Sequence, residues 1–307
     1  MHTGKKYKGV VVPAVTPLTG QLTLDQEAVE RLFESFHRSG VMPFIAGTTG
    51  EAASLPAALK KEYIRLAGQL KQAGTVLYAG ISSNNLDESI ALANYGFDNG
   101  VDVVAATLPS YYLLTEDEMQ RYFETLADHI NGPLIIYNIP ATTHMSIPLH
   151  VADELSYHEK IVGAKDSERS EERLNASLRL WKDRPDFSYF LGWAAKSAEA
   201  LLEGCDGLIP STGNLYPRLY ADMTSAAGQN HREEAFRLQA LSDELGNLYQ
   251  AGRSLGQSLW ALKVLMQQEG LCQARVMPPL QGQPGDEEKK LQEGLRAILD
   301  QYNIKLS

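Results

Sequence analysis

The stretch Ile161-Val162-Gly163-Ala164-Lys165, followed at once by Asp166-Ser167, is the pattern of a buried strand that ends on an amine. In parallel α/β folds, ligands bind at the carboxyl ends of the strands. A lysine held there loses hydration, so its pKa falls and the free amine can attack a ketone to form a Schiff base. The alternative interpretation is a surface lysine that lies just past a strand.

Other short apolar runs lie on both sides of this one. Together they predict eight buried strands, at residues 10–12, 43–46, 76–79, 101–106, 134–137, 161–164, 187–191 and 207–209. Continuous apolar runs favour a parallel sheet, because its strands are buried on both faces. Between the runs, apolar residues follow helical spacing, as at Val29, Leu32, Phe33 and Phe36. Eight such units predict an α/β protein of the (β/α)8 TIM-barrel type.

Helix boundaries are predicted from local signals. Thr23 with Gln26, and Thr115 with Glu118, read as capping boxes that begin helices. Glycines at 40, 74 and 100 stand where helices should end.

The pattern changes after about residue 230. Leucines at 238, 241, 245 and 248 follow helical spacing, and the proline-containing segment 277–285 separates two further helical stretches. We therefore expect a barrel over residues 1–230 and a C-terminal helical extension over 231–307, packed together as one structural unit.

Composition excludes several classes of protein. The 307 residues carry 28 Lys and Arg against 38 Asp and Glu, a net charge of −10 that argues against nucleic-acid or acidic-membrane partners. The polar start of the chain lacks a signal-peptide core, and no apolar run reaches transmembrane length, so a cytoplasmic location is expected. Neither Cys205 and Cys272 nor the histidines at 144, 150 and 158 suggest a disulfide framework or a metal site.

Three polar motifs follow predicted strands. Gly47-Thr48-Thr49-Gly50-Glu51 follows the second strand, where glycines let backbone amides approach a ligand and the hydroxyls add donors suited to a carboxylate. Tyr137-Asn138-Ile139-Pro140 ends the fifth strand with a phenol that can relay protons. Pro109-Ser110-Tyr111-Tyr112 follows the fourth strand. The plainer alternatives are a tight turn that caps a helix, a packing tyrosine, and packing or interface tyrosines, respectively.

These motifs, in this order with Gly163-Ala164-Lys165-Asp166, resemble the dihydrodipicolinate synthase/N-acetylneuraminate lyase superfamily. The resemblance covers essentially the whole chain. It implies a TIM barrel with C-terminal helices, a homotetramer built as a dimer of dimers, and a class I lyase that joins pyruvate or another 2-oxo acid to a lysine. It implies no metal and no dissociable cofactor.

The resemblance also assigns roles to particular residues. Lys165 is the Schiff-base lysine and Tyr137 the proton shuttle, while Thr48 and Thr49 form a hydroxyl pair beside the tyrosine and the substrate carboxylate. Tyr111 reaches across a subunit interface to complete the proton relay. Gly47 and Ile209 line the substrate pocket.

The resemblance to individual activities is weaker at two places. Dihydrodipicolinate synthases resemble Tyr-Asn-x-Pro-x-Arg-Thr-Gly at the fifth strand, whereas Thr142 stands at the arginine position and cannot supply a charged fork. Sialic acid lyases carry an acidic pair after the seventh strand, where this chain reads Gly192-Trp193-Ala194-Ala195-Lys196.

Three functions follow as alternatives. The first is an aldolase or dehydratase for a 2-keto-3-deoxy sugar acid, with a distal pocket that includes Thr142, Trp193 and Ser211. The second is a dihydrodipicolinate synthase that condenses pyruvate with aspartate semialdehyde at an unusual aldehyde site. The third is a non-catalytic barrel that binds a 2-oxo acid, which would have no need of the proton relay at Tyr137.

Overall fold

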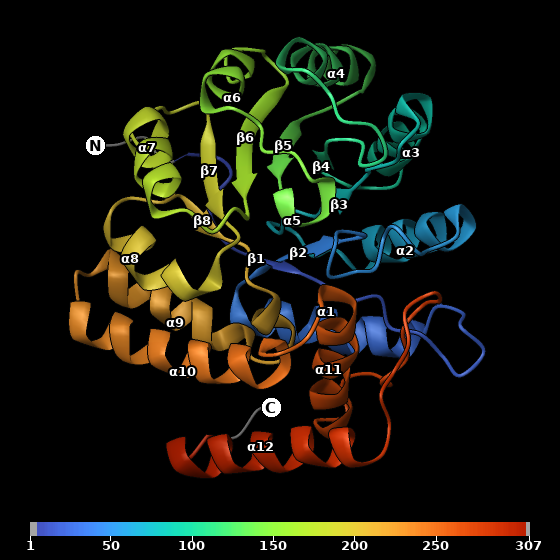
Figure 1. The fold of residues 1–307 in the computed structure, drawn as a ribbon, viewed down its shortest axis with the longest axis vertical. Helices are drawn as coiled ribbons and strands as arrows, with labels where there is room; N and C mark the ends of the chain where they lie inside the picture. The colour runs from blue at the N-terminus through green and yellow to red at the C-terminus, as the bar shows by residue number, and fades with distance from the viewer. Residues whose placement is uncertain (1–4, 305–307) are drawn as a thin grey trace.

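Eight parallel strands close into a barrel in the structure, a computed structural model that describes residues 5–304 (Figure 1). Each strand pairs with its neighbour in sequence, and the last pairs with the first, so the sheet has no free edge. The strands are β1 (Gly9–Pro13), β2 (Met42–Ile45), β3 (Tyr78–Gly80), β4 (Val103–Thr107), β5 (Leu134–Asn138), β6 (Ile161–Asp166), β7 (Ser188–Leu191) and β8 (Gly207–Leu208). The predicted (β/α)8 barrel is confirmed.

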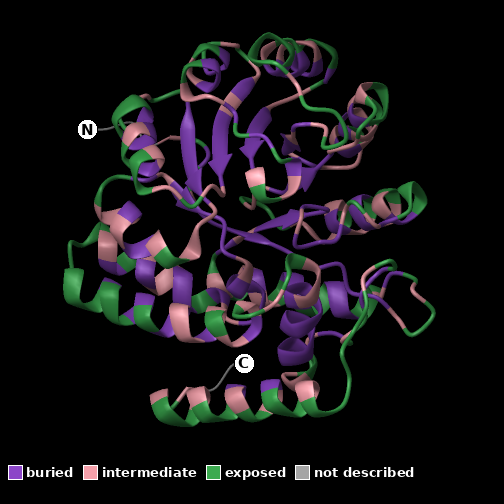
Figure 2. Cartoon of the chain, viewed as in Figure 1, coloured by how far each residue is buried: buried purple, intermediate pink, exposed green. Residues whose placement is uncertain are grey.

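Helices connect the strands and cover the barrel. They are α1 (Gln26–Ser39), α2 (Ala57–Leu70), α3 (Leu86–Asp98), α4 (Glu116–His129), α5 (Pro140–Thr143), α6 (Leu149–Leu155), α7 (Glu171–Trp181), α8 (Ser197–Leu202) and α9 (Pro217–Gly228). Short 3-10 helices follow β7 and β8, namely η1 (Ala194–Lys196) and η2 (Ser211–Asn214). Figure 2 shows the strands buried along most of their length, while the helices alternate buried and exposed faces.

The apolar side chains form two separate cores. The larger lies between the strands and the surrounding helices, and includes Val29, Leu32, Phe33 and Phe36 as their helical spacing predicted. The smaller fills the barrel interior and comprises Tyr7, Val11, Phe44, Tyr78, Val103, Ala105, Ile135, Phe190 and Ile209. Alternate residues of each strand serve the two cores because successive side chains point to opposite faces.

The third strand begins later than the sequence predicted, at Tyr78 rather than residue 76. The Leu77 amide donates to Asp102 Oδ2 at 2.8 Å, and the Val76 amide donates to the Met42 sulfur at 3.3 Å. These side-chain acceptors replace the carbonyl groups of the neighbouring strands, so the ladder begins two residues further on.

One of the two predicted capping boxes is wrong. Thr115 and Glu118 do form a capping box at α4, but α1 is capped by Asp25, whose side chain accepts from the Ala28 amide. The Thr23 hydroxyl instead lies 2.8 Å from the Thr19 hydroxyl within the preceding turn. Gly40 ends α1 with φ of 67°, in the left-handed conformation that favours glycine.

The C-terminal extension contains α10 (Arg232–Gln250), α11 (Leu255–Gln268) and α12 (Asp286–Tyr302). In Figure 1, α10 runs beside α8 and α9, and α12 lies at the edge of the molecule. Leu238, Leu241 and Leu245 are buried, as their spacing predicted. None of the helices in residues 5–304 combines the length and apolar character that a membrane span needs.

Side chains of α10 and α11 bond to several loops at the carboxyl ends of the strands. Tyr249 pairs with the hydroxyls of Ser211 and Thr212 after β8, and Gln239 bonds to Ala194 and Ala198 after β7. Lys263 reaches the loops after β1 and β2.

Candidate active site

Tyr137 and Lys165 are register partners on β5 and β6 at the carboxyl ends of these strands. The Lys165 Nζ lies 3.8 Å from the centroid of the Tyr137 ring and 4.9 Å from that of Phe44. Lys165 is 3% exposed and lies near the end of β6. The prediction of a strand that carries a buried amine at its end is therefore confirmed. The alternative of a surface lysine is therefore wrong.

Burial and mutual charge shift both ionisable groups of this pair. Burial lowers the pKa of Lys165 below its usual value, and the Tyr137 phenol offsets only part of that effect. Burial alone would raise the pKa of Tyr137, but the charge of Lys165 and hydrogen bonding from Thr48 and Ser167 outweigh it, so the net pKa is lowered. Both groups therefore release protons more readily than in water, which favours a neutral amine beside a phenol able to donate its proton.

Thr48 lies beside the phenol, with its hydroxyl 3.4 Å from the Tyr137 oxygen. The turn that carries it follows β2 and is closed by hydrogen bonds from the Glu51 amide to the Thr48 carbonyl and from the Ala52 amide to the Gly47 carbonyl. Gly50 lets the backbone of the turn pack closely, because a Cβ here would lie only 3.0 Å from the Ala14 carbonyl oxygen, so a larger residue would force the backbone to shift.

The end of this turn is anchored by a buried ion pair. Lys263 Nζ lies 2.5 Å from Glu51 Oε1, and neither side chain is exposed to solvent. The same nitrogen donates to the carbonyls of Thr16 and Arg275, at 2.7 and 2.6 Å, and the Met277 amide donates to the other Glu51 oxygen at 2.6 Å. Because every polar atom of the pair has a partner, the desolvation of both charges is compensated.

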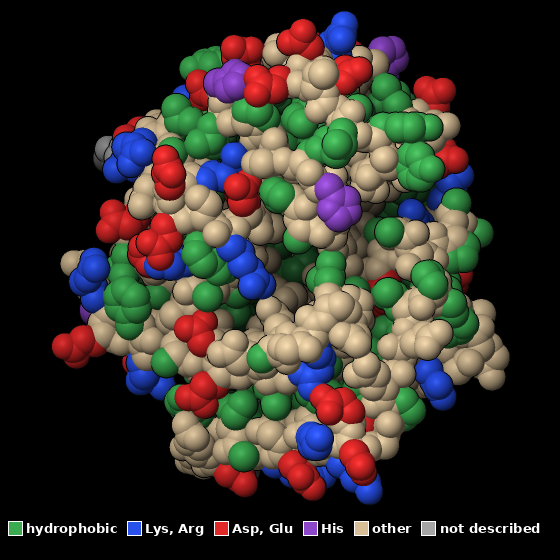
Figure 3. All heavy atoms as spheres, in the orientation of Figure 1, with side chains coloured by type: hydrophobic (Ala, Val, Ile, Leu, Met, Phe, Trp, Pro, Cys, Tyr) green, Lys and Arg blue, Asp and Glu red, His purple; other side chains and the backbone are tan. Residues whose placement is uncertain are grey.

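A cavity of about 490 Å³ opens beside Tyr137, and Lys165 itself is not among the residues that line it. Among the predicted site residues, its lining includes Gly47, Thr48, Tyr137 and Thr142, together with Thr143. The face in Figure 3 is hollowed near its centre, and acidic and basic side chains are interspersed over it. Within residues 5–304, no group of three or more His, Cys, Asp or Glu side chains is arranged to hold a metal ion.

The other predicted site residues lie outside the lining of this cavity. Thr49 is buried in the β2 turn, Ile209 belongs to the barrel-interior core with Phe44, and the Ser211 hydroxyl lies 2.7 Å from that of Tyr249. Trp193 is half-buried, with Lys196 Nζ 5.8 Å from its ring centroid. Their contact with substrate stays a prediction.

Tyr111 is exposed on the loop between β4 and α4. It is 77% exposed, packs edge-on against Tyr112 with ring centroids 4.9 Å apart, and is followed by the equally exposed Leu113. Within one chain, Tyr111 therefore stands in solvent; its role across a subunit interface stays a prediction.

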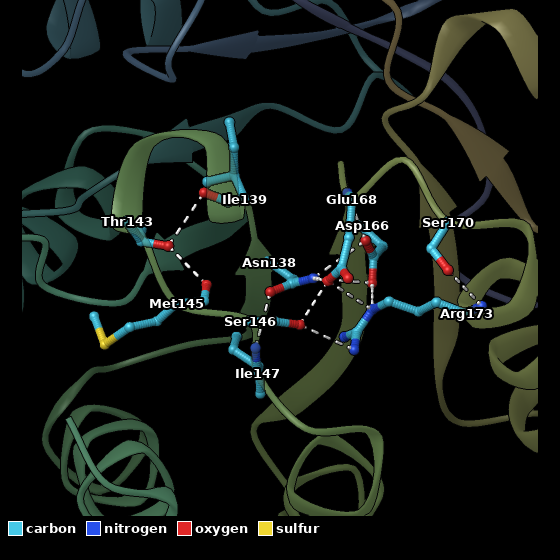
Figure 4. Close-up of polar contacts among 10 residues, drawn as sticks. All are labelled: Asn138, Ile139, Thr143, Met145, Ser146, Ile147, Asp166, Glu168, Ser170 and Arg173. Atoms are coloured by element: carbon cyan, nitrogen blue, oxygen red, sulfur yellow. Dashed lines mark hydrogen bonds and ion pairs between the residues drawn. The ribbon is translucent and has the colours of Figure 1, made fainter. Parts of the chain in front are cut away.

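A polar group behind Lys165 and Tyr137 was not predicted from the sequence; it is formed by Asn138, Ser146, Asp166, Glu168 and Arg173 (Figure 4). Strand alternation could have indicated Asn138 and Asp166, because each directly follows a reactive residue on its strand. Arg173 comes from α7, and no local pattern indicates its contact.

A parallel barrel that holds a buried lysine against a tyrosine at its strand ends is typical of barrel enzymes that use an amine. Residues 6–299 match the model of the dihydrodipicolinate synthetase family, and the chain belongs to that family. The family resemblance inferred from the motifs is thereby confirmed, and the protein is a lyase.

Individual relatives agree over nearly the full chain. An uncharacterized DapA-like lyase of Thermococcus kodakarensis is 31% identical over 95% of this chain and 98% of its own. A 4-hydroxy-tetrahydrodipicolinate synthase of Alkalilimnicola ehrlichii is 30% identical over 89% of this chain and 92% of its own. The solved dihydrodipicolinate synthase of Bacteroides thetaiotaomicron superimposes with a TM-score of 0.90 at 29% identity, covering 96% of this chain and all of its own (100%).

Proposed function

We propose that the protein is a class I lyase in which Lys165 forms an imine with the carbonyl carbon of pyruvate or another 2-oxo acid. The observation that carries this proposal is the buried amine of Lys165, 3.8 Å from the ring centre of a tyrosine that also bonds to Thr48. The lowered pKa of Lys165 supports it, because the neutral amine is the nucleophile.

In the proposed reaction, the neutral amine attacks C2 of the substrate and one of its protons passes to the oxygen. The Tyr137 phenol supplies a second proton, so that water leaves and a protonated imine remains beside the phenolate. The imine then accepts the electron pair of the C3–C4 bond, while the phenolate takes the proton of the C4 hydroxyl. An aldehyde departs, and the phenol returns its proton to C3 of the enamine. Water then hydrolyses the protonated imine to pyruvate and the neutral amine, and the proton set free restores the phenol.

The turn after β2 is proposed to hold the substrate carboxylate. In this proposal its backbone amides and the hydroxyls of Thr48 and Thr49 donate to the carboxylate without a full counter-charge. Thr48 also links this turn to the phenol.

We further propose a 2-keto-3-deoxy sugar acid as the substrate. Thr142 and Thr143 line the cavity, and the half-buried Thr142 hydroxyl donates to the Ile139 carbonyl at 3.3 Å, which leaves its oxygen free to accept from a substrate hydroxyl. Neutral acceptors suit a polyhydroxy chain better than a second carboxylate.

A second candidate is the condensation of pyruvate with aspartate semialdehyde. The name of the Alkalilimnicola ehrlichii relative favours it, while Thr142 at the arginine position counts against it. We propose in addition that the active form is a cytoplasmic homotetramer, supported by the exposed apolar side chains of Tyr111, Tyr112 and Leu113.

Incubation with pyruvate and borohydride, followed by peptide mass spectrometry, tests the Schiff-base proposal. We expect a reduced adduct on Lys165 and none in Lys165→Ala. If pyruvate binds in calorimetry without an adduct, the protein is the non-catalytic binder. Pyruvate release from 2-keto-3-deoxy acids, compared with pyruvate consumption with aspartate semialdehyde, then separates the two catalytic candidates.

A further inference from the structure

The polar group behind the reactive pair, here termed the rear cluster, consists of Asn138, Ser146, Asp166, Glu168 and Arg173 (Figure 4). Asn138 and Asp166 are register partners, immediately after the partners Tyr137 and Lys165. Because side chains alternate along a strand, one pair faces the barrel interior and the next faces the helices. Asn138 and Asp166 are 4% and 3% exposed, so the centre of the rear cluster is closed to solvent, whereas Ser146 at its edge is exposed.

The Asp166 carboxylate is the centre of the rear cluster. Arg173 Nε donates to its Oδ2 at 2.5 Å, and the Glu168 amide donates to its Oδ1 at 2.8 Å. The Asn138 Nδ2 lies 3.3 Å from both carboxylate oxygens and donates to Glu168 Oε2 at 3.0 Å. Burial raises the pKa of Asp166, and Arg173 offsets part of that rise. The ends of β5 and β6 are thus joined by side chains as well as by the ladder.

The rear cluster also holds the segment that follows α5. Asn138 Oδ1 accepts from the Ile147 amide at 3.0 Å, and Ser146 donates to Glu168 Oε2 at 2.5 Å. Thr143, on the cavity wall, bonds to the Met145 carbonyl at 2.9 Å in the same segment. One group of polar side chains, with Asn138 and Asp166 buried at its centre, therefore connects the strand ends that carry Tyr137 and Lys165 to one wall of the cavity.

We propose that Asp166 and Arg173 are positioning residues, which hold the amine of Lys165 against the Tyr137 ring by fixing the ends of β5 and β6 from behind. The catalytic consequence rests on the proposed function, but the positioning itself does not. Misplacement of a reacting group by about 1 Å can cost a hundredfold in rate, so a restraint at the adjacent residue is sufficient to matter.

The substitution Asp166→Asn tests this proposal, because it keeps the shape of the side chain and removes the charge that Arg173 binds. Asp206→Asn is a matched control. Asp206 resembles Asp166 because its largely buried carboxylate pairs with a single cation and accepts from a backbone amide. Its partners are Lys5, at 2.7 Å, and the Tyr189 amide, at 2.8 Å. The Asp206 side chain is 11% exposed, compared with 5% for Asp166. Asp206 directly precedes β8, so it lies at the amino ends of the strands, far from the carboxyl ends where Asp166 lies.

The first measurement is the pH dependence of trace acetylation of Lys165 by acetic anhydride, read by peptide mass spectrometry. This measurement does not depend on the protein being an enzyme. Loosening of the strand ends admits water, so we expect the labelling midpoint in Asp166→Asn to rise by about 1 pH unit. Asp206→Asn should keep the wild-type midpoint even if it lowers thermal stability to a similar degree.

The second measurement is the rate of borohydride trapping against pyruvate concentration. We expect the maximal rate to fall roughly ten- to a hundredfold in Asp166→Asn. The half-saturating concentration should stay within about twofold of wild type, because the β2 turn proposed to hold the carboxylate is anchored by Lys263 on α11.

A wild-type labelling midpoint in a folded Asp166→Asn protein overturns the proposal, whatever the trapping shows. Absence of a wild-type pyruvate adduct instead overturns the proposed function and leaves the labelling result to decide the positioning. Where Asp166→Asn does not fold, Arg173→Lys replaces it, since lysine keeps the charge but not the fixed geometry of the guanidinium. A smaller shift in the same direction is expected, and no shift in Arg173→Lys overturns the proposal as well.

Discussion

The Lys165 nitrogen lies 3.8 Å from the centre of the Tyr137 ring, so the ionisation of each residue depends on the other. Burial lowers the pKa of Lys165, and the Tyr137 phenol offsets part of that effect. Removal of the phenol therefore affects both proton transfer and the basicity of the amine.

Tyr137→Phe should slow turnover by roughly a hundredfold, the scale of a lost general acid–base group. It should also move the acetylation midpoint of Lys165 to lower pH, because the phenol that favours the ammonium form is gone. Below that midpoint Lys165 is protonated and unreactive; above it the free amine reacts. An unchanged rate together with an unchanged midpoint would reduce Tyr137 to a packing residue.

Lys165→Ala should abolish turnover and leave the fold intact. The substitution removes an amine that burial already disfavours as a cation, so circular dichroism and the thermal unfolding midpoint should remain close to wild type. Retained turnover in the purified variant would end the Schiff-base interpretation.

Lys263→Met should destabilise the protein by about 3–5 kcal/mol, because it leaves the buried Glu51 carboxylate unpaired. Urea unfolding measures the loss. The exposed pair of Arg237 and Glu234 is the control, and Arg237→Met should cost no more than about 1 kcal/mol. Equal losses in both variants would contradict the importance of burial.

Asp25→Ala should cost about 1 kcal/mol of unfolding free energy, since Asp25 caps α1 by accepting from the Ala28 amide. Thr23→Ala should cost clearly less, because its hydroxyl bonds only within the turn before the helix. A larger loss for Thr23→Ala would restore the capping box that the sequence predicted.

Dilution should lower specific activity if Tyr111 completes the site of a neighbouring subunit. Sedimentation velocity at the assay concentrations gives the oligomeric state, and Tyr111→Ala should weaken association because it removes part of an exposed aromatic pair. Full activity in a demonstrated monomer would rule out this role.

The strands and the positions of Lys165 and Tyr137 at their ends were predictable because both depend on local patterns. An apolar run of strand length that leads into polar residues predicts a buried strand and locates its carboxyl end, as at Lys165 and Tyr137. The register of these two residues then follows from the order of the strands around the barrel.

What the sequence did not predict depends on contacts between distant residues. The start of β3 was misplaced because Asp102 captures the Leu77 amide, and nothing near Leu77 indicates this. Arg173 reaches Asp166 from the next helix, and Lys263 reaches Glu51 across 212 residues. Charged side chains on helices are usually solvated, so their burial here follows only from the tertiary structure.

The ion pair of Glu51 and Lys263 also implies an order of events on the ribosome. Glu51 emerges long before Lys263, since 212 positions separate them, and its carboxylate has no cation until α11 has been synthesised. The turn with Thr48 and Thr49 can therefore reach its final geometry only late in synthesis. A nascent chain could therefore pair β5 with β6, and so bring Tyr137 beside Lys165, before the turn proposed to bind the carboxylate is complete.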